Sequence, residues 1–477
     1  MRSDMELNVV NKSEFSSGGV FGRLDAEYVS KSIWEMEKHL RRQTGYLLAK
    51  EIVGYDGPAL NDSFRPAESI LDYIAIDSID TSDGLTHADE LRYEDRPSRA
   101  KYLTQQGDVL VSNVRPNRGA VALIGELRSG CAASSGFSLL RTKAGADLSQ
   151  AFIFAFLKSR YGRSQLERRA RGSMYPAIVY SDLTDVWIPK PPKAVSVVVE
   201  ENVILGVALQ EEFFRLVKKQ GEMMAAFLEP VGAPPSPLSG DTSKVNYTEV
   251  LRSASLRAGS AERIDAEFFR SEYAEFDEKL KREKPTFLLG AHFALTPGRG
   301  LGSGEAIVPF IKQGVLTNAG VNWSAISYEE GSGAPKGGRV SAGDILLACT
   351  AHEIYYVGRK VDFVRDVPAQ LKDNEAVPDL MILRPRPEKP PTPHGSYVAA
   401  FLRCPSGLHQ VQRCIRGLRG GHVYKHDLAA YVRVPVPPDE WLLEFEKRAE
   451  EYEGVRDRAK LTMNRAFKVV EDWVGSI

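Results

Sequence analysis

Side chains suited to contacting a nucleic acid gather in one short stretch of the chain. "SNVRPNRG", which begins at Ser112, supplies two amides and two guanidinium groups from Asn113, Arg115, Asn117 and Arg118. Arginine can donate to guanine, asparagine can pair with adenine, and basic side chains neutralise phosphates. The stretch follows an alternating apolar run at Val109, so we expect a loop at the end of a half-buried strand. An ordinary surface turn is the alternative.

The second half of the chain carries different side chains at the corresponding place. There the sequence reads "ACTAHEIYY", with Thr350, His352 and Tyr355 in the loop. The residues before the two loops match, whereas the loops themselves do not. Two copies of one frame with different loops would read two different short DNA sequences.

Basic residues are concentrated in the same two parts of a chain whose net charge is only -1. Twelve basic and four acidic residues occur from Lys101 to Tyr175, and five basic residues with no acid from Phe401 to His426. A solvated basic face is the alternative for either segment. The candidate DNA contacts are Asn113, Arg115, Asn117, Arg118, Arg168, Arg169, Arg171, Tyr175, Thr350, His352, Tyr355, Arg416, Arg419, His422 and Lys425.

The sequence does not contain the common catalytic motifs. It has no phosphate-binding Gly-x-x-x-x-Gly-Lys-Ser/Thr loop, no Gly-x-Ser-x-Gly elbow, and no Asp/Asn-Pro-Pro-aromatic motif for methyl transfer to an amino group. Pro378-Asp379 lacks the downstream part of a metal-dependent nuclease pattern. His422 and His426 are spaced as ligands on one helical turn, but no third ligand is near them. We therefore expect no enzyme activity, no cofactor and no metal.

A tandem repeat explains why these features occur twice. "RLDAEYV" at Arg23 is answered by "RIDAEFF" at Arg263, and "GDVLV" at Gly107 by "GDILL" at Gly343. "AFLKSRYGRSQLERRARG" is a helix-like segment that is answered by "AFLRCPSGLHQVQRCIRG", and in both copies an Asp-Leu pair follows eleven residues after the last Arg. "WIPKPP" and "RVPVPP" then predict short strands that prolines end. The offsets of 240, 236, 245 and 246 drift only slightly, so the order indicates an internal duplication.

A long helix is expected after each copy. Apolar residues recur near helical spacing from Val195 to Glu229 and from Asp439 to Val474. Each helix would be roughly 40 to 55 Å long and would have an apolar stripe in need of a partner. Antiparallel packing of the two helices against each other is the simplest solution. The alternative is that they are two separate docking helices. The predicted layout is a first domain (1–194), a helix (195–229), a linker (230–254), a second domain (255–438) and a last helix (439–477).

Composition places the chain among ordinary globular proteins, with 43% hydrophobic and 26% charged residues. The strand and helix patterns of each repeat predict the α+β class. No apolar run is long enough to span a bilayer, and the first residues do not resemble a secretion signal. The four cysteines are few and show no Cys-x-x-Cys spacing. A cytoplasmic location without membrane contact is expected.

The ordered, duplicated set of motifs resembles the specificity subunit of type I restriction–modification systems. The resemblance rests on "GDVLVSNVRPNRGAVALIGE", "SDLTDVWIPKPP", "GDILLACT" and "HDLAAYVRVPVPP", and it covers roughly residues 20 to 475. It implies two tandem mixed α/β target recognition domains, related by pseudo-twofold symmetry and separated by two long antiparallel helices. The second copy lacks the Arg-Pro loop of the first, so the role of Arg115 does not transfer to it.

The resemblance also implies how such a chain works. It would be a non-catalytic subunit of a phage-defence complex that reads a bipartite target in double-stranded DNA, with half-sites about one helical turn apart. Its partners would be adenine-N6 methyltransferase subunits, two per chain, and restriction or translocase subunits. The alternatives are a scaffold protein that does not bind DNA and a nuclease with dispersed catalytic residues.

Overall fold

The computed structural model describes most of the chain. The described residues are 31–42, 45–55, 66, 69–172, 175–234, 268, 270–299, 304–331, 338–351, 354–387, 395–417 and 421–477. The matching phrases at Arg23 and Arg263 lie outside them. Among the described helices, none is long and apolar enough to cross a membrane.

The chain forms two compact units that do not follow a single cut in the sequence. Unit 1 contains residues 1–214 and 453–477, and unit 2 contains residues 215–452. Each unit therefore includes one part of each long helix. The division of each half of the sequence into a recognition domain and a separate helix stays a prediction.

The elements of unit 1 begin with a helix and continue through mixed strands and short helices. They are α2 (Lys31–Arg42), β1 (Gly45–Leu47), α3 (Leu48–Glu51), β2 (Ile52–Tyr55), β3 (Ile70–Ile74), η1 (Ile76–Ser78), β4 (Asp89–Arg92), η2 (Tyr93–Asp95), β5 (Ala100–Leu103), β6 (Val109–Ser112), η3 (Pro116–Arg118), β7 (Val121–Leu123), η4 (Glu126–Arg128), β8 (Ala132–Ser134), β9 (Phe137–Thr142), α4 (Gln150–Lys158), α5 (Arg160–Arg169), α6 (Tyr180–Thr184), β10 (Trp187–Pro189) and the first part of α7 (Lys193–Leu228).

Unit 2 follows a similar order, without a counterpart of β5 and with one additional small sheet, β16-β21-β20. Its elements are α9 (Ser271–Glu283), β11 (Thr286–Leu288), α10 (Leu289–His292), β12 (Phe293–Pro297), β13 (Ala306–Ile311), η6 (Gln313–Val315), η7 (Trp323–Ala325), β14 (Ser327–Gly331), β15 (Ile345–Ala348), β16 (Thr350–Ala351), η8 (Ile354–Tyr356), β17 (Val361–Phe363), η9 (Ala369–Leu371), β18 (Glu375–Ala376), β19 (Leu380–Pro385), α11 (Gly395–Arg403), α12 (Pro405–Arg413), β20 (Ile415–Arg416), β21 (Gly421–Val423), α13 (Lys425–Tyr431), β22 (Arg433–Pro435) and the first part of α14 (Asp439–Ser476).

The strand order confirms the predicted duplication. An antiparallel sheet has the order β2-β9-β6-β7 in unit 1 and β12-β19-β15-β17 in unit 2. In a second sheet, β3 pairs antiparallel with β4 and parallel with β8, and β13 pairs in the same two ways with β14 and β18. A third, two-stranded sheet joins β1 to β10 in one unit and β11 to β22 in the other. Each unit is thus a mixed α+β fold built on one topology.

Side-chain contacts repeat between the units as well. The Arg141 guanidinium pairs with the buried Asp108 carboxylate, and Arg384 pairs in the same way with the buried Asp344. The glycines that precede these two aspartates, with φ of 89° and 90°, adopt the left-handed conformation that favours glycine. This conformation explains why both copies keep the same Gly-Asp start.

In each unit, one glutamine side chain makes hydrogen bonds to both the N–H and the carbonyl of a single residue in a short strand. The Gln165 amide donates to the Trp187 carbonyl and accepts from the Trp187 N–H, at 2.9 and 2.8 Å. The Gln410 amide makes the same two bonds with Arg433, at 3.0 and 2.7 Å. The two folds therefore agree down to individual buried hydrogen bonds.

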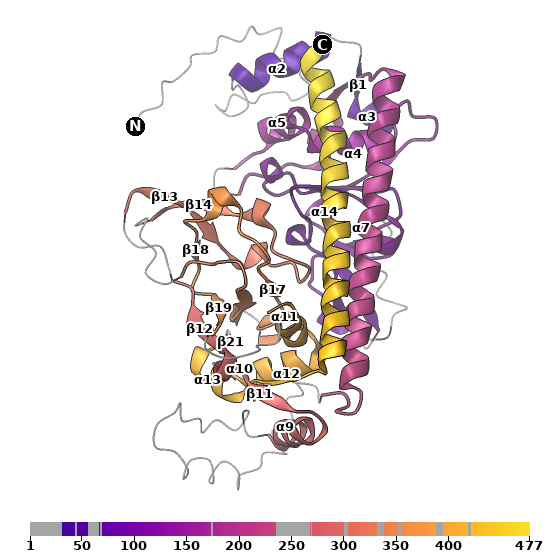
Figure 1. Ribbon diagram of the computed structural model, residues 1–477. Coiled ribbons are helices and arrows are strands. Elements are labelled where there is room, and N and C mark those ends of the chain that lie inside the picture. Colours follow the sequence, from indigo (N-terminus) through magenta and orange to yellow (C-terminus); the bar gives the residue numbers. More distant parts are fainter. Residues whose placement is uncertain are drawn as a thin grey trace. The chain divides into compact units, whose positions relative to one another are not determined.

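The two long helices pack against each other in antiparallel order within each unit, as predicted (Figure 1). In unit 1 the helix glycine at 206 lies against the Met463 side chain. In unit 2 the Phe227 and Trp441 rings are 4.8 Å apart, and the Gln220 amide donates to the Phe445 carbonyl. In these contacts, higher residue numbers of α7 are paired with lower residue numbers of α14, so the two helices run in opposite directions.

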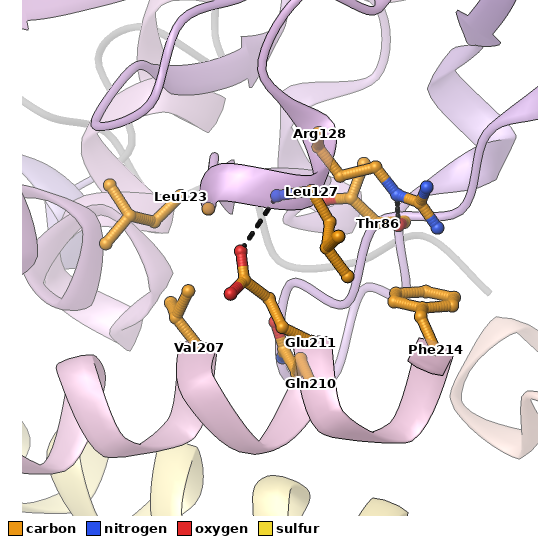
Figure 2. Close-up of a pocket in the computed structure, with 9 residues that line it drawn as sticks. Thr86, Leu123, Leu127, Arg128, Val207, Gln210, Glu211 and Phe214 are labelled. Atoms are coloured by element: carbon orange, nitrogen blue, oxygen red, sulfur yellow. Dashed lines mark hydrogen bonds between the residues drawn. The ribbon is translucent and has the colours of Figure 1, made fainter. Parts of the chain in front are cut away.

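The core of unit 1 includes side chains from both long helices. Val199 and Val203 of α7 and Met463 and Val470 of α14 are buried with Phe152 of α4. Figure 2 shows a second anchor on α7, where the Glu211 carboxylate accepts from the Leu127 N–H at 3.0 Å. The helices are therefore part of the folded unit and not loosely attached arms.

One predicted helix is broken in both copies. The segment expected as one helix forms α4 and α5 in unit 1, separated by Ser159 with φ -64° and ψ 161°. In unit 2 it forms α11 and α12, separated by Cys404 with φ -66° and ψ 159°. The extended backbone at these residues cannot continue a helix. In unit 1, Ser159 caps the start of α5, and in unit 2, Pro405 is the first residue of α12.

The glycine three residues after each break is expected to be essential for packing. A Cβ at Gly162 would lie 2.3 Å from the Phe156 carbonyl oxygen, and one at Gly407 would lie 2.0 Å from the Phe401 carbonyl oxygen. Because the obstacle is backbone, Gly162→Ala and Gly407→Ala should each destabilise their unit by about 1–3 kcal/mol or more. Thermal unfolding of the full chain measures this.

Two other helix glycines provide matched controls. Gly221 in α7 and Gly454 in α14 have open space where a Cβ would lie. Replacing either by alanine should leave stability unchanged or raise it by up to about 1 kcal/mol, because alanine favours a helix. Equal behaviour of all four variants would show that the close approach in α5 and α12 has no energetic weight.

Candidate nucleic-acid interface

The two units present different side chains at one equivalent place in the fold. In unit 1 the Asn113 N–H donates to the Gly136 carbonyl, and the Asn113 carbonyl accepts from the Ile178 N–H. In unit 2 the N–H of Cys349 donates to the Asp379 carbonyl, and the Cys349 carbonyl accepts from the Val423 N–H of β21. The residues that follow Asn113 and Cys349 therefore start at the same point and diverge from it.

In unit 1 this place carries the Arg115 loop. Arg115 has φ 50° and ψ 53°, a left-handed conformation that is strained for a residue with a side chain, and its N–H donates to the Pro176 carbonyl at 2.6 Å. Its guanidinium carbon lies 4.9 Å from the centroid of the Tyr175 ring, and Tyr175 is 66% exposed. The fold thus holds a cation and an aromatic ring together at the surface.

Two further cations lie in or next to this loop. Arg118 is exposed, and its pKa is lowered by partial burial and by the nearby Arg115. Arg163 of α5 is exposed and donates to the Asn117 carbonyl at 2.8 Å. Arg163 was not among the predicted residues, although it belongs to the basic segment 101–175, which was the available signal. Arg115, Arg118 and Arg163 are thus three cations near one another, and cations of this kind can neutralise phosphates.

The amides of the loop have different roles. Asn117 is exposed, so its side chain is open to a ligand. The Asn113 side chain is half-buried, and its carbonyl oxygen accepts from the Ser138 hydroxyl at 2.7 Å. Asn113 therefore helps to hold the loop on the sheet.

The expectation that Arg168 and Arg169 contact DNA is corrected by the structure. Both side chains are 2% exposed, and both pair with the buried Glu37 carboxylate of α2, at 2.5 and 2.9 Å. Burial alone would raise the pKa of Glu37, but Arg169 and Arg168 outweigh it and lower the pKa to about 2. The two guanidinium groups neutralise a buried acid and are not available to a phosphate.

Arg171 and Arg416 make the same ion pair in the two units. Arg171 binds both oxygens of Asp182, and Arg416 binds both oxygens of Asp427, at 2.7 to 2.9 Å. The aspartates are buried, whereas the arginines are 44% and 36% exposed. Each arginine thus links the residues that follow α5 or α12 to the next helix, α6 or α13, and its charge is largely balanced.

In unit 2 the equivalent place is an open pocket of about 610 Å³. We call it the Asp379 pocket; it is lined by Lys312, Gln313, Gly314, Thr350, Ala351, Val377, Asp379, Gly421 and His422. The Thr350 hydroxyl donates to Asp379 Oδ1 at 2.8 Å, and the Gln313 amide donates to the Thr350 carbonyl at 2.9 Å. Polar groups from four separate segments therefore converge here, which the sequence could not show.

An imidazole that lines this pocket contacts an exposed aromatic ring. His422 lies in β21, and its ring centroid is 4.4 Å from that of Tyr424, which is 48% exposed. Burial lowers the pKa of His422, although Asp379 opposes this effect, so the imidazole is favoured in its neutral form. His426 lies in α13 and not on a shared helical turn with His422. Tyr424 was not among the predicted residues.

Of the remaining predicted contact residues, two lie within the described part of the chain and two lie outside it. Lys425 is exposed at the first position of α13. Tyr355 lies in η8, and His352 and Arg419 lie outside the described residues. Among the residues that are described, no group of three or more His, Cys, Asp or Glu side chains is arranged to hold a metal ion.

Among known proteins, the chain matches solved structures but no family model and no curated protein. The HsdS subunit from Thermoanaerobacter tengcongensis matches with 16% identity and a TM-score of 0.31, over 90% of this chain and 95% of that one. The type I restriction–modification S subunit from M. genitalium matches with 13% identity and a TM-score of 0.35, over the same shares. A chain from a study of complex assembly and conformational transition of the type I restriction–modification system matches with 18% identity and a TM-score of 0.25, over 87% and 97%.

Proposed function

We propose that this chain is a sequence-specific DNA-recognition subunit, in which each unit reads one half of a bipartite target. The observation that carries the proposal is that two folds with the same hydrogen bonds bear different chemistry at one equivalent place. Unit 1 offers a cationic loop with Tyr175, and unit 2 offers the Asp379 pocket. A shared scaffold with different contact residues suits the reading of two different sequences.

The three arginines would contribute to DNA binding in two different ways, through phosphate contacts and through a base contact. Arg118 and Arg163 are exposed cations that would neutralise phosphates, which gives salt-dependent affinity without sequence preference. Arg115 is held at a fixed angle by its strained backbone and by Tyr175, so it is suited to aim at a base edge. Guanine, with two acceptors in the major groove, is the base that arginine binds best.

We further propose that other chains perform the reactions. The chain would position adenine-N6 methyltransferase subunits, two per chain, and restriction or translocase subunits, in a phage-defence complex of type I. Exposed apolar side chains on the unit 1 part of α7 support a partner surface: Ile204 is 64% and Leu205 is 53% exposed. Contiguous exposed apolar residues on a long helix are typical of a protein interface.

Arg115→Ala is the experiment that tests this function. In the complex purified with its partner subunits, the variant should lose roughly tenfold to hundredfold in affinity for targets with the correct first half-site. Preference at the second half-site should not change, because unit 2 does not contain Arg115. Selection from a randomised DNA duplex library, followed by sequencing, measures both preferences at once.

Arg99→Ala serves as the matched control, because Arg99 is an exposed arginine of unit 1 outside the loop. It should leave both half-site preferences intact. An equal loss of affinity for every sequence in Arg115→Ala would reduce Arg115 to a phosphate contact. If the unaltered complex retains no DNA at any salt concentration, the proposed function is wrong.

A further inference from the structure

Unit 2 places a carboxylate where unit 1 has a hydrogen atom. Asp379 and Gly136 each directly precede an inner strand of the equivalent sheet, β19 in unit 2 and β9 in unit 1. Their carbonyls accept equivalent hydrogen bonds, from Cys349 N–H and Asn113 N–H. The Asp379 side chain is thus an addition to a shared frame, and it is exposed in the Asp379 pocket.

The hydrogen bonds of the pocket leave two acceptors unused. Asp379 Oδ1 accepts from the Thr350 hydroxyl, and the Gln313 amide nitrogen donates to the carbonyls of Thr350 and Asp379, at 2.9 and 3.3 Å. Within the part of the chain that the structure describes, Asp379 Oδ2 and Gln313 Oε1 make no hydrogen bond. The donors of Gln313 are occupied, so the pocket offers oxygen acceptors held at fixed positions.

A carboxylate in a DNA-contacting surface cannot be a phosphate contact, because like charges repel. It can accept from an N–H donor, and the donors on base edges in the major groove are the amino groups of cytosine and adenine. We propose that Asp379 and Gln313 bind the exocyclic amino group of one base, cytosine N4 or adenine N6, in the half-site that unit 2 reads. This inference rests on the proposed function and names the specificity determinant of its second unit.

Asp379→Asn is the sharpest test, because it changes one acceptor into a donor at constant size. The asparagine oxygen can still accept from Thr350, while its amide nitrogen replaces Oδ2. In the complex with its partner subunits, preference at one base pair of the second half-site should fall by roughly tenfold to hundredfold and move towards guanine or thymine, which present acceptors. The first half-site should be read as before.

Asp366→Asn is the control, because it removes an equal charge from an exposed aspartate of unit 2 outside the pocket. It should change no base preference. An unchanged preference in Asp379→Asn, or a uniform change for all sequences that Asp366→Asn shares, would overturn the inference. Loss of all DNA retention by the unaltered complex would instead contradict the proposed function.

A measurement on the unaltered protein removes any dependence on folding of the variant. Once selection has identified the base as cytosine or adenine, a duplex with 2-pyrimidinone or purine at that position lacks only the amino group. Its affinity for the complex should be roughly tenfold to hundredfold lower. Equal affinity for the two duplexes would show that no amino group is bound there.

Discussion

Replacing Glu37 by glutamine is expected to lower the free energy of unfolding by about 3–5 kcal/mol. Glu37 is 1% exposed and neutralises both Arg168 and Arg169, which are themselves buried. The glutamine variant removes the carboxylate that pairs with both buried guanidinium groups, and breaking a buried ion pair by removing one partner is strongly destabilising. Urea unfolding of the full chain measures the loss, and hydrogen exchange of α5 assigns it to unit 1.

Glu35→Gln is the matched control on the same helix. Glu35 is exposed, so its replacement should change stability by less than about 0.5 kcal/mol. If the two variants unfold alike, the buried ion pair is not what joins α2 to α5.

The same ion pair predicts a dependence on pH. The pKa of Glu37 is lowered from 4.5 to about 2 in the folded chain, so the ionised carboxylate stabilises the fold fully above pH 4.5. That contribution, about 3 kcal/mol, should be lost as the pH falls from 4.5 towards 2. In Glu37→Gln, this part of the acid dependence should be absent.

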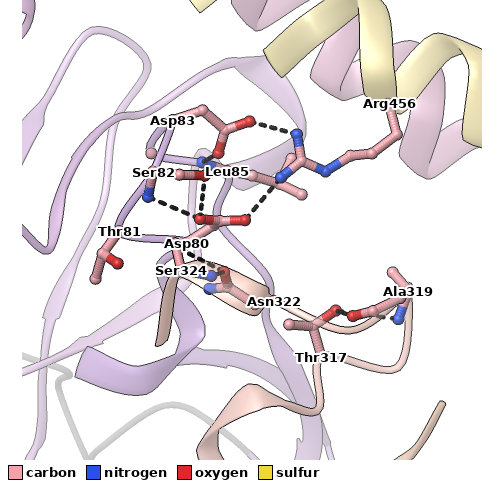
Figure 3. A network of polar contacts seen from close by, with 12 residues as sticks. Asp80, Thr81, Ser82, Asp83, Leu85, Thr317, Ala319, Asn322, Ser324 and Arg456 are labelled. Atoms are coloured by element: carbon pink, nitrogen blue, oxygen red, sulfur yellow. Dashed lines mark hydrogen bonds and ion pairs between the residues drawn. The ribbon is translucent and has the colours of Figure 1, made fainter. Parts of the chain in front are cut away.

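Replacing Arg456 by methionine should have an effect of similar size, again about 3–5 kcal/mol. Arg456 of α14 pairs with two buried aspartates of the loop after η1, Asp80 at 2.8 Å and also Asp83 (Figure 3). Burial raises the pKa of Asp80, but Arg456 and the bonds from Ser82 outweigh it, so the pKa is lowered. Methionine keeps the bulk of the side chain and removes the charge that this loop requires.

Neutralising the loop should restore part of the stability. In the Arg456→Met background, Asp83→Asn removes one of the two buried carboxylates that have lost their arginine, so the double variant should unfold at higher urea than the single one. Arg458→Met, two residues away at an exposed position, should be nearly silent. Additive losses from Arg456→Met and Asp83→Asn would show that the two residues do not interact.

The duplication could be read from the sequence because the repeated residues are those that the fold requires. The Gly-Asp pairs start the central strands with a left-handed glycine and a buried aspartate, and the Arg-to-Asp spacing of eleven is the Arg171–Asp182 and Arg416–Asp427 ion pair. The two long helices were predictable from apolar periodicity, and their observed bounds differ from the predicted ones by a few residues.

The errors come from contacts between distant parts of the chain. Arg168 and Arg169 look like a basic patch because their acid, Glu37, lies 131 and 132 residues earlier. The helix break at Ser159 was missed because the apolar residues continue through it, although Pro405 in the second copy was a signal. The Asp379 pocket was missed because its residues come from separate segments that the sheets bring together.

Selection of DNA by the unaltered complex tests the central claim most directly. The claim is that two copies of one scaffold read two different sequences. From a randomised duplex library, the complex should enrich two different short sequences separated by a fixed stretch without base preference. Enrichment of one continuous sequence, of two identical sequences, or of none would contradict it.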